Sequence, residues 1–574
     1  MLTNRIDKEG KIYYGIMTIL ISMAIIFIIH SWIVTDGLPY HSDANESFSA
    51  YVQGQNMLNF DPLKNAFLPD DAPAKHEGAH PFTYTHGPNL PRYFSYIMTV
   101  LGIKSLGAQI LLSSIGSLLL SVWFILKSFP EVIYSTKKGR AYHFSFLIIA
   151  LFCLDFLGTL QFIVNLWRTW HFPLFWGCVW AVRAKPRKPI VFLLYYLLFQ
   201  LEFLFALFTL CSCFGYYIWD NRINWKKGFG STGFMIVVAS ISSLVTFIAQ
   251  LIIFYGFKGF LFDLKTTYIA RNTNTIEWNS ISDFYEAHSV MMWPSTPSWD
   301  FHFSLFLKVT FENLLSKLSP TIAFLFLSSL LVSFFLLIIS KRYSWTKKQL
   351  LFKLNTSLSP LLWSTVITYL LLGLTIPGYT LNGYVHRWAP LLIFPVILAL
   401  ALLVVNLLEV IMIVLKSKEI KEKLKYYFIP TFSIFILTLW IVMSVNHYQR
   451  YPHFVHTPAK ILSTKYKGHS FVSGTTFPHM ISHYTGKWAY YSPTVFPGDL
   501  RLDQTHNWNA DRNKNTDYEI PEYYLCEVLP YNGYLNCDEI AKQMVDLGHI
   551  LVESEIGYRI IKLNWRLPVN KVSS

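Results

Sequence analysis

The sequence predicts a polytopic α-helical membrane protein with about eleven transmembrane helices and a C-terminal extracytoplasmic α/β domain. Of the 574 residues, 53% are hydrophobic and only 14% are charged, whereas soluble chains carry about 25% charged residues. The apolar residues come in blocks of about 20, the length that a helix needs to cross the bilayer. Basic residues gather in alternate short loops, and this pattern places those loops in the cytoplasm.

The apolar blocks predict the limits of the spans. The first block is too long for a signal-peptide core, and no small-residue cleavage site follows it, so we expect a retained anchor. The fifth and sixth spans are either two helices or one long helix, because only Gln200 and Glu202 interrupt the apolar run. The expected spans are 12–34, 105–127, 143–160, 165–182, 190–201, 203–219, 231–257, 319–340, 357–377, 388–415 and 427–446.

The net charge of +14 indicates orientation and argues against nucleic-acid binding. Many basic residues lie in short loops between spans, such as Lys137, Lys138 and Arg140 after the second span. Acidic and basic residues are nearly balanced in the tail after Asn446. We therefore expect a plasma (inner) membrane protein with its N-terminus in the cytoplasm and its tail on the periplasmic or extracellular side.

Three outer segments are long enough to carry function. A membrane domain is expected over 1–446, with large outer loops at 36–104 and 258–318. The C-terminal domain is expected over 447–574. Because the loops on the cytoplasmic side are short and basic, any chemistry is expected to face outward.

The first outer loop contains two expected helices. The pattern from Ala44 to Leu58 suits an amphipathic helix, with Asp43 placed to cap its N-terminus. Pro88 and Pro91 then open an apolar stretch that is too short to cross the bilayer. We expect this second helix to lie in the membrane interface.

The tail has mixed α/β character. Strands are expected at 469–474 and 549–554, a helix at 537–548, and a closing strand at 557–563. Cys526 and Cys537 form a disulfide that closes a short loop, or remain as two free thiols.

His76, Glu77 and His80 fit the H-E-x-x-H pattern of zinc peptidases. Gly78 within the motif and a proline directly after it are unfavourable for the helix that such a site needs. A loop metal site that also uses His86 is one alternative, and solvated loop histidines are the other. We therefore predict no metal site here.

Two acidic residues, Asp43 and Glu46, lie three positions apart at the outer end of the first span. They are either a helix cap with an exposed acid, or carboxylates at the membrane surface that take a proton from an attacking hydroxyl. Arg168 and His171 lie near the start of the fourth span, where an ionisable residue is expensive and is a functional candidate. A snorkelling Arg168 is the alternative, and helix pairing is expected for Glu202.

His386 and Arg387 lie at the outer mouth of the tenth span. Two donors at the boundary between lipid and water suit an anion such as a lipid phosphate, which arginine binds in a bidentate way. An interfacial anchor formed with neighbouring aromatic residues is the alternative.

Taken together, these features resemble the GT-C superfamily of membrane glycosyltransferases, which use polyprenyl-phosphate-linked sugars. Members include protein O-mannosyltransferases and aminoarabinose transferases. One span precedes a large outer loop that opens with acidic residues and closes with "THGPNLPRYFSY" (85–96), which resembles a "(K/H)-x-P-x-x-x-Y" type stretch with one additional residue before the tyrosine. Arg387, Trp388 and Pro390, with Pro395, resemble an "R-Y/W-x-x-P-x-x-x-x-P" type entry to a late span, with one residue fewer before the first proline.

The resemblance implies an inverting transfer of a sugar to an acceptor glycan, lipid or protein hydroxyl at the outer membrane surface. Asp43 would act as the base, with Glu46 as the other candidate acid. The departing polyprenyl phosphate would be stabilised by four residues: His86, Arg168, His386 and Arg387. A Mg²⁺ or Mn²⁺ ion would be an optional aid, and no protein metal ligands are assigned.

Two other function classes remain open at this point. One is a transporter or flippase for a lipid-linked glycan, although the sequence has no inverted repeat. The other is a non-catalytic protein of envelope assembly. Turnover of a polyprenyl-phosphate sugar by purified protein separates the enzyme from both.

Overall fold

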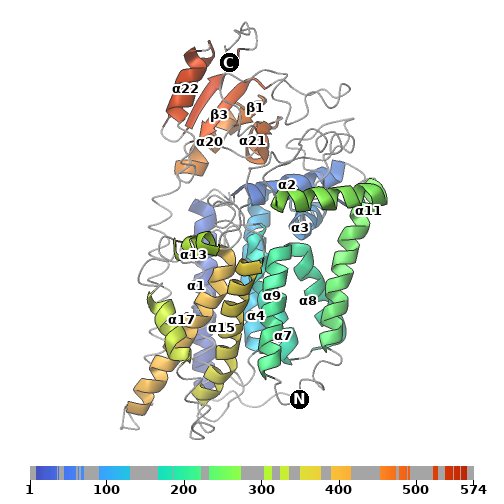
Figure 1. The fold of residues 1–574 in the computed structure, drawn as a ribbon. Helices are drawn as coiled ribbons and strands as arrows, with labels where there is room; N and C mark the ends of the chain where they lie inside the picture. Colours follow the sequence, from blue (N-terminus) through green and yellow to red (C-terminus); the bar gives the residue numbers. More distant parts are fainter. Residues whose placement is uncertain are drawn as a thin grey trace.

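The computed structural model describes most of the predicted spans and part of the tail. The described residues are 8–34, 37, 44–59, 62–63, 66–69, 89–128, 166–184, 186–220, 232–272, 303–312, 324–334, 350–375, 389–414, 438, 453–473, 478–487, 489–491, 521–527, 537–546, 548–555 and 558–564. Within them, a bundle of helices carries a small sheet at one end (Figure 1).

The first long helix, α1 (Lys8–Val34), is anchored to α4 (Leu106–Ser128) at the end of the bundle that faces the sheet. Trp32 Nε1 donates a hydrogen bond to the carbonyl oxygen of Gly107 at 2.7 Å. Gly37 has a φ of +72°, and a Cβ there would lie 3.1 Å from Gly107 Cα. A helix of 27 residues is about 40 Å long, so Lys8 lies at the opposite end of the bundle.

The start of α1 and the C-terminal sheet therefore lie at opposite ends of the bundle (Figure 1). The compartment that each end faces remains a prediction.

Two short helices, α2 (Ala44–Asn59) and α3 (Leu90–Val100), pack against each other at the same end of the bundle (Figure 1). Both helices expected in the first outer loop are therefore present. The buried face of α3 carries Arg92, Ser95 and Thr99, so the helix turns polar groups toward the protein as well as apolar ones.

The centre of the bundle is formed by short helices. A 3-10 turn, η2 (Arg168–Trp170), leads into α7 (His171–Ala184), and α8 (Lys188–Leu201) and α9 (Phe203–Asp220) follow. Glu202 has φ −163° and ψ 130°, an extended conformation that ends α8. The fifth and sixth spans are thus two helices that stand side by side (Figure 1), and the alternative of one long helix is wrong.

The helix α11 (Thr232–Asn272) bends at Gly256, which has a φ of +73°. Glycine adopts this left-handed conformation without the cost of a Cβ clash. The first part of α11 runs along the bundle, and the second part crosses the end of the bundle (Figure 1). The bend coincides with the predicted end of the seventh span at residue 257.

The remaining described helices of the bundle are α13 (Phe303–Glu312), the segment Phe324–Phe334, α15 (Leu350–Thr375) and α17 (Ala389–Val414). Helix α13 lies in the second outer loop, where no structure was predicted. The predicted span 143–160 lies outside the described residues, and so does 427–446 apart from residue 438.

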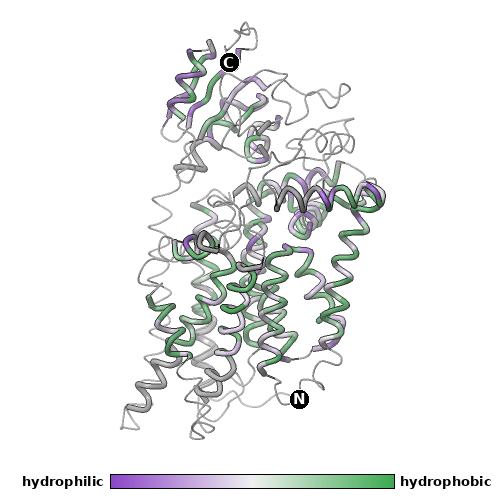
Figure 2. Tube along the Cα trace, in the orientation of Figure 1, coloured by the Kyte–Doolittle hydropathy of each residue, from purple (hydrophilic) through white to green (hydrophobic). Residues whose placement is uncertain are grey.

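The helices of the bundle consist mostly of hydrophobic residues (Figure 2), and many of their large apolar side chains are exposed. Ile253 is 72% exposed and Phe234 is 63% exposed, both on α11. Among the described helices, Leu106–Ser128 and Thr232–Lys265 are long and apolar enough to cross a membrane. Such a surface is costly in water and is suited to lipid.

The C-terminal region, from His453 on, contains a five-stranded mixed sheet in the order β2-β1-β3-β5-β4. Strand β1 runs parallel to β2 and β3, while β5 runs antiparallel to β3 and β4. The elements are α20 (His453–Thr464), β1 (Phe471–Ser473), α21 (Pro478–Thr485), β2 (Ala489–Tyr491), β3 (Tyr523–Glu527), α22 (Cys537–Asp546), β4 (Ile550–Glu555) and β5 (Tyr558–Lys562).

The three strands and the helix predicted in the tail correspond to β1, β4, β5 and α22. The sequence did not predict α20, α21, β2 or β3. One of these strands, β3, lies between the predicted strands β1 and β5, and β2 forms the edge beside β1, so the order of the sheet was not available from the pattern.

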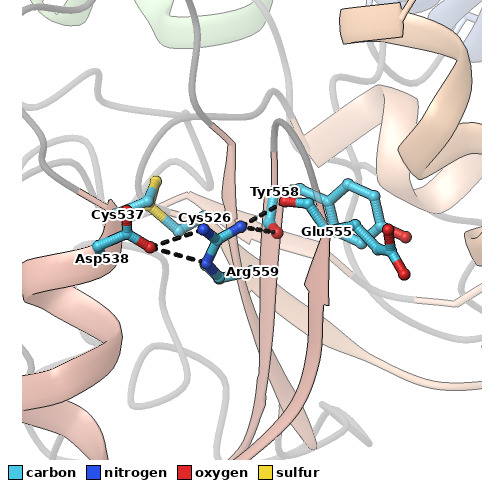
Figure 3. The surroundings of a disulfide bond; sticks show 6 residues. All are labelled: Cys526, Cys537, Asp538, Glu555, Tyr558 and Arg559. Atoms are coloured by element: carbon cyan, nitrogen blue, oxygen red, sulfur yellow. Dashed lines mark hydrogen bonds and ion pairs between the residues drawn. A yellow bond between two sulfur atoms is a disulfide. The ribbon is translucent and has the colours of Figure 1, made fainter.

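A disulfide joins Cys526 on β3 to Cys537 at the start of α22, with a Cα–Cα distance of 5.8 Å (Figure 3). The alternative of two free thiols is wrong for this pair. On the neighbouring strand β5, Arg559 Nε donates to Asp538 Oδ1 at 2.9 Å. The disulfide and this ion pair both fix α22 on the sheet.

Candidate active site

Most of the predicted site residues lie outside the described residues: Asp43, His86, His386 and Arg387, together with His76 and His80. Glu46 lies in the first turn of α2, where the structure describes its backbone. The side chain of Arg168 is described. The convergence of all these residues at one site therefore remains a prediction.

Arg168 lies in the 3-10 turn before α7 and is 4% exposed. The segment around it is held from two sides. The backbone N–H of Leu166 donates to Ser47 Oγ of α2 at 3.0 Å, and Ser117 Oγ of α4 donates to the carbonyl oxygen of Thr169 at 2.5 Å. The first turn of α2, which contains Glu46, thus lies beside the segment that carries Arg168.

A second buried arginine reaches the same segment from α3. Arg92 is 1% exposed, and its guanidinium lies over the ring of Trp167 at 4.7 Å from the centroid. Its Nη1 donates to Asn89 Oδ1 at 3.0 Å. A buried guanidinium is costly unless it is paired, and the aromatic face and the amide offset part of that cost. Two fixed positive charges therefore lie near the segment that begins at Leu166.

Two further N–H donors lie in this region. Asn89 Nδ2 and Trp170 Nε1 are buried and find no hydrogen-bond acceptor in the described part of the chain. The orientation of the Asn89 amide follows from its bond with Arg92, because only the oxygen can accept from a guanidinium. Buried donors beside guanidinium groups form an environment that suits an anion.

His171 joins the start of α7 to the break between α8 and α9. Its Nδ1 lies 2.9 Å from the carbonyl oxygen of Arg168, and its Nε2 lies 3.0 Å from Glu202 Oε2. A carbonyl oxygen only accepts, so Nδ1 carries a proton. A proton must then lie between Nε2 and the carboxyl group as well, on one side or the other. The helix pairing predicted for Glu202 is confirmed, and it fixes the turn that carries Arg168.

A buried polar network holds α2 and α3 on α4. Ser95 Oγ donates to Gln109 Oε1 at 2.7 Å, and Gln109 Nε2 donates to Thr99 Oγ1 at 2.9 Å. Gln55 Nε2 of α2 donates to the same Thr99 oxygen at 2.5 Å. Gly54 allows the close approach, because a Cβ there would lie 2.7 Å from Ser95 Cβ.

A cavity of about 230 Å³ lies elsewhere, among α7, α8, α9 and α11. It is almost entirely apolar, so it offers few partners for a sugar or a phosphate. Its lining residues are Val182, Tyr195, Leu210, Cys211, Cys213, Phe214, Tyr217, Thr232, Gly233, Ile236 and Val237. In the described ranges, no three His, Cys, Asp or Glu side chains gather as a metal site.

Arg92 was not among the predicted site residues, although the sequence contains a signal for it. Arg92, Ser95 and Thr99 are spaced three and four residues apart on a short helix with an apolar remainder. That spacing places them on one face. A polar stripe with an arginine on such a helix indicates that the face packs on protein or on a ligand.

Comparisons with known proteins give limited information. No protein-family model matches the sequence, and no curated protein matches it. Among solved structures, the chain is similar to ArnT from Cupriavidus metallidurans in the apo state, with 9% sequence identity and a TM-score of 0.49. The match covers 96% of this chain and 99% of that chain. The function proposed next depends on the residues of this chain.

Proposed function

We propose that this protein is a membrane glycosyltransferase that moves a sugar from a polyprenyl-phosphate donor to an acceptor at the outer membrane surface. The observation that carries the proposal is a pair of buried arginines, Arg92 on α3 and Arg168 in the turn before α7. A guanidinium buried in a membrane protein is expensive and is retained where it has a partner or a task. A lipid phosphate is an anion that can reach such a group from the bilayer.

The reaction would proceed with inversion at the anomeric carbon. The acceptor hydroxyl oxygen attacks that carbon and forms the new glycosidic bond, while its proton passes to the carboxylate of Asp43. The bond between the anomeric carbon and the phosphate oxygen breaks, and polyprenyl phosphate leaves with the bonding electrons. Arg92 and Arg168 supply positive charge for the departing phosphate.

The remaining predicted residues complete this assignment. His86 and the pair His386 and Arg387 would contact the same phosphate from the first outer loop and from the start of α17. Glu46, in the first turn of α2, is the second candidate acid. A divalent cation is not required by this scheme, because arginines supply the charge.

The test is deletion of the gene in the source organism, followed by mass spectrometry of envelope glycans and lipids. One sugar is expected to be missing, and plasmid-borne wild-type protein restores it. Asp43→Asn is expected to insert normally and to restore nothing, because the amide cannot accept the proton. Arg168→Lys keeps the charge but loses the planar fork, so we expect about 10–100-fold slower transfer.

Asp538→Asn is the matched control, since that carboxylate is 72% exposed on α22. Full restoration of the sugar by Asp43→Asn would show that Asp43 is not the base. An unchanged envelope in the deletion strain would count against sugar transfer altogether.

A further inference from the structure

Helix α21 of the C-terminal region packs directly on α2 of the first outer loop. The rings of His483 and Phe48 lie 5.4 Å apart, and those of His483 and Tyr51 also lie 5.4 Å apart. Tyr484 meets Phe48 edge-on at 5.7 Å. Phe48 has no exposed surface, and Met480 belongs to the same apolar cluster as the helices of the bundle. The contact is therefore a packed core and not a surface touch.

The opposite face of α21 belongs to the C-terminal sheet. Ile481 is fully buried in the cluster that includes Phe471 of β1 and Ala489 of β2. The carbonyl oxygen of Thr485 accepts a hydrogen bond from the backbone N–H of Gly468 at 2.7 Å. Helical spacing places 481 and 485 on one side and 480 and 483 on another, and Tyr484 lies between these sides and packs against both clusters. A rigid sheet thus presents a fixed aromatic face to α2.

On its other sides, α2 is held by the membrane bundle. Ser47 accepts the hydrogen bond from Leu166, and Gly54 and Gln55 meet α3. Helix α2 therefore packs against the bundle on one side and against the C-terminal region on the other. The aromatic contact falls at Phe48, two residues after Glu46 and one after Ser47. The contact between His483 and Phe48 therefore restrains the first turn of α2.

We propose that α21 positions the first turn of α2, the turn that contains Glu46, for sugar transfer. This inference rests on the proposed function. His483 is a positioning residue in this scheme, because it acts through Phe48 and Tyr51 and contacts no reacting atom. Removal of the aromatic contact is expected to loosen the first turn of α2 while the sheet stays folded.

The test compares three variants of the full chain by hydrogen exchange of residues 44–51 and by the rate of sugar transfer. His483→Ala removes the ring, so we expect faster exchange in this segment and about 10–100-fold lower kcat with an unchanged KM for the donor. His483→Phe keeps an aromatic ring and is expected to restore both. Arg559→Ala, in the same sheet but away from α2, is expected to change neither.

Exchange and transfer separate the two hypotheses. If His483→Ala leaves the exchange of residues 44–51 at the wild-type rate, α21 does not position α2, whatever the activity. If the exchange rises as expected but wild-type protein transfers no sugar, α21 does hold the first turn of α2 in place and the proposed function is wrong. An equal loss in Arg559→Ala would mean that the effect is general unfolding, and the positioning role would be rejected.

Discussion

Replacement of Gly54 by alanine is expected to force α2 away from α3. The added Cβ would lie 2.7 Å from both Cβ and Oγ of Ser95 and 2.9 Å from the backbone nitrogen of Tyr96. Ordinary contacts between carbon atoms are about 3.5–4.0 Å, so the helices must separate by about 1 Å. Overpacking of this kind costs about 1–3 kcal/mol. The better helix propensity of alanine returns about 1 kcal/mol.

Gly116 is the matched control for this change. It also lies within a helix, α4, but a Cβ there meets nothing within 4 Å. Gly116→Ala therefore gains the propensity without the clash, and the two variants are expected to differ by about 2 kcal/mol. Thermal unfolding of both variants in the same detergent, followed by tryptophan fluorescence, shows which variant unfolds at the lower temperature. The reasoning is refuted if Gly54→Ala unfolds at the same temperature as Gly116→Ala or above it.

Two more predictions concern the C-terminal region. The Cys526–Cys537 disulfide closes a loop with a sequence separation of 11 residues. In the variant with both cysteines replaced by serine, the free energy of unfolding of the C-terminal region is expected to fall by about 3 kcal/mol, so a protease should cut this region faster. Equal cutting rates in the variant and the wild type would contradict this. Burial lowers the pKa of His483 from 6.5 to about 4. Between these pH values the His483 side chain binds a proton more readily in the unfolded state than in the folded state. The contribution of His483 to the free energy of unfolding therefore falls by about 3 kcal/mol as pH drops from 6.5 to 4, and this contribution does not change further below pH 4. Unfolding midpoints across this range should depend less on pH in His483→Phe, and equal slopes would exclude His483 as the cause.

Several parts of the fold were predictable because they depend on local properties. A run of about 20 apolar residues has few alternatives to a membrane helix. The helix at α2, the short helix at α3 and the strand pattern at β4 and β5 follow from periodicity within one element. A disulfide between Cys526 and Cys537 was one of two alternatives, because the two residues are isolated in the tail and close together in the chain; the structure decided for it.

The break at Glu202 was not decided by pattern. The apolar run continues across it, and its extended conformation accompanies the bond between Glu202 and His171, which lies 31 residues earlier. A contact of this range is invisible to a local window. The same holds for the strand order of the sheet, since β5 inserts between β3 and β4.

The candidate site divides in the same way. Arg168 was a candidate because an ionisable residue at membrane depth is expensive wherever it points. Arg92 was not predicted as a candidate, because its contact with the ring of Trp167 and its burial both depend on how α3 packs against the rest of the protein. Neither property can be read from the 11 residues of α3 alone.

The sequence by itself determined that the chain has long apolar helices, an alternating basic pattern and a mixed α/β tail, because each of these is set by residues close together in the chain. Only the tertiary structure decided that α3 carries an arginine to the segment of Arg168, and that α21 packs on α2 at Phe48. Ser47 meets Leu166 across 119 residues. Contacts between residues so far apart in the chain depend on how all the intervening helices pack. That packing is set by the free energy of the whole chain and not by any one segment.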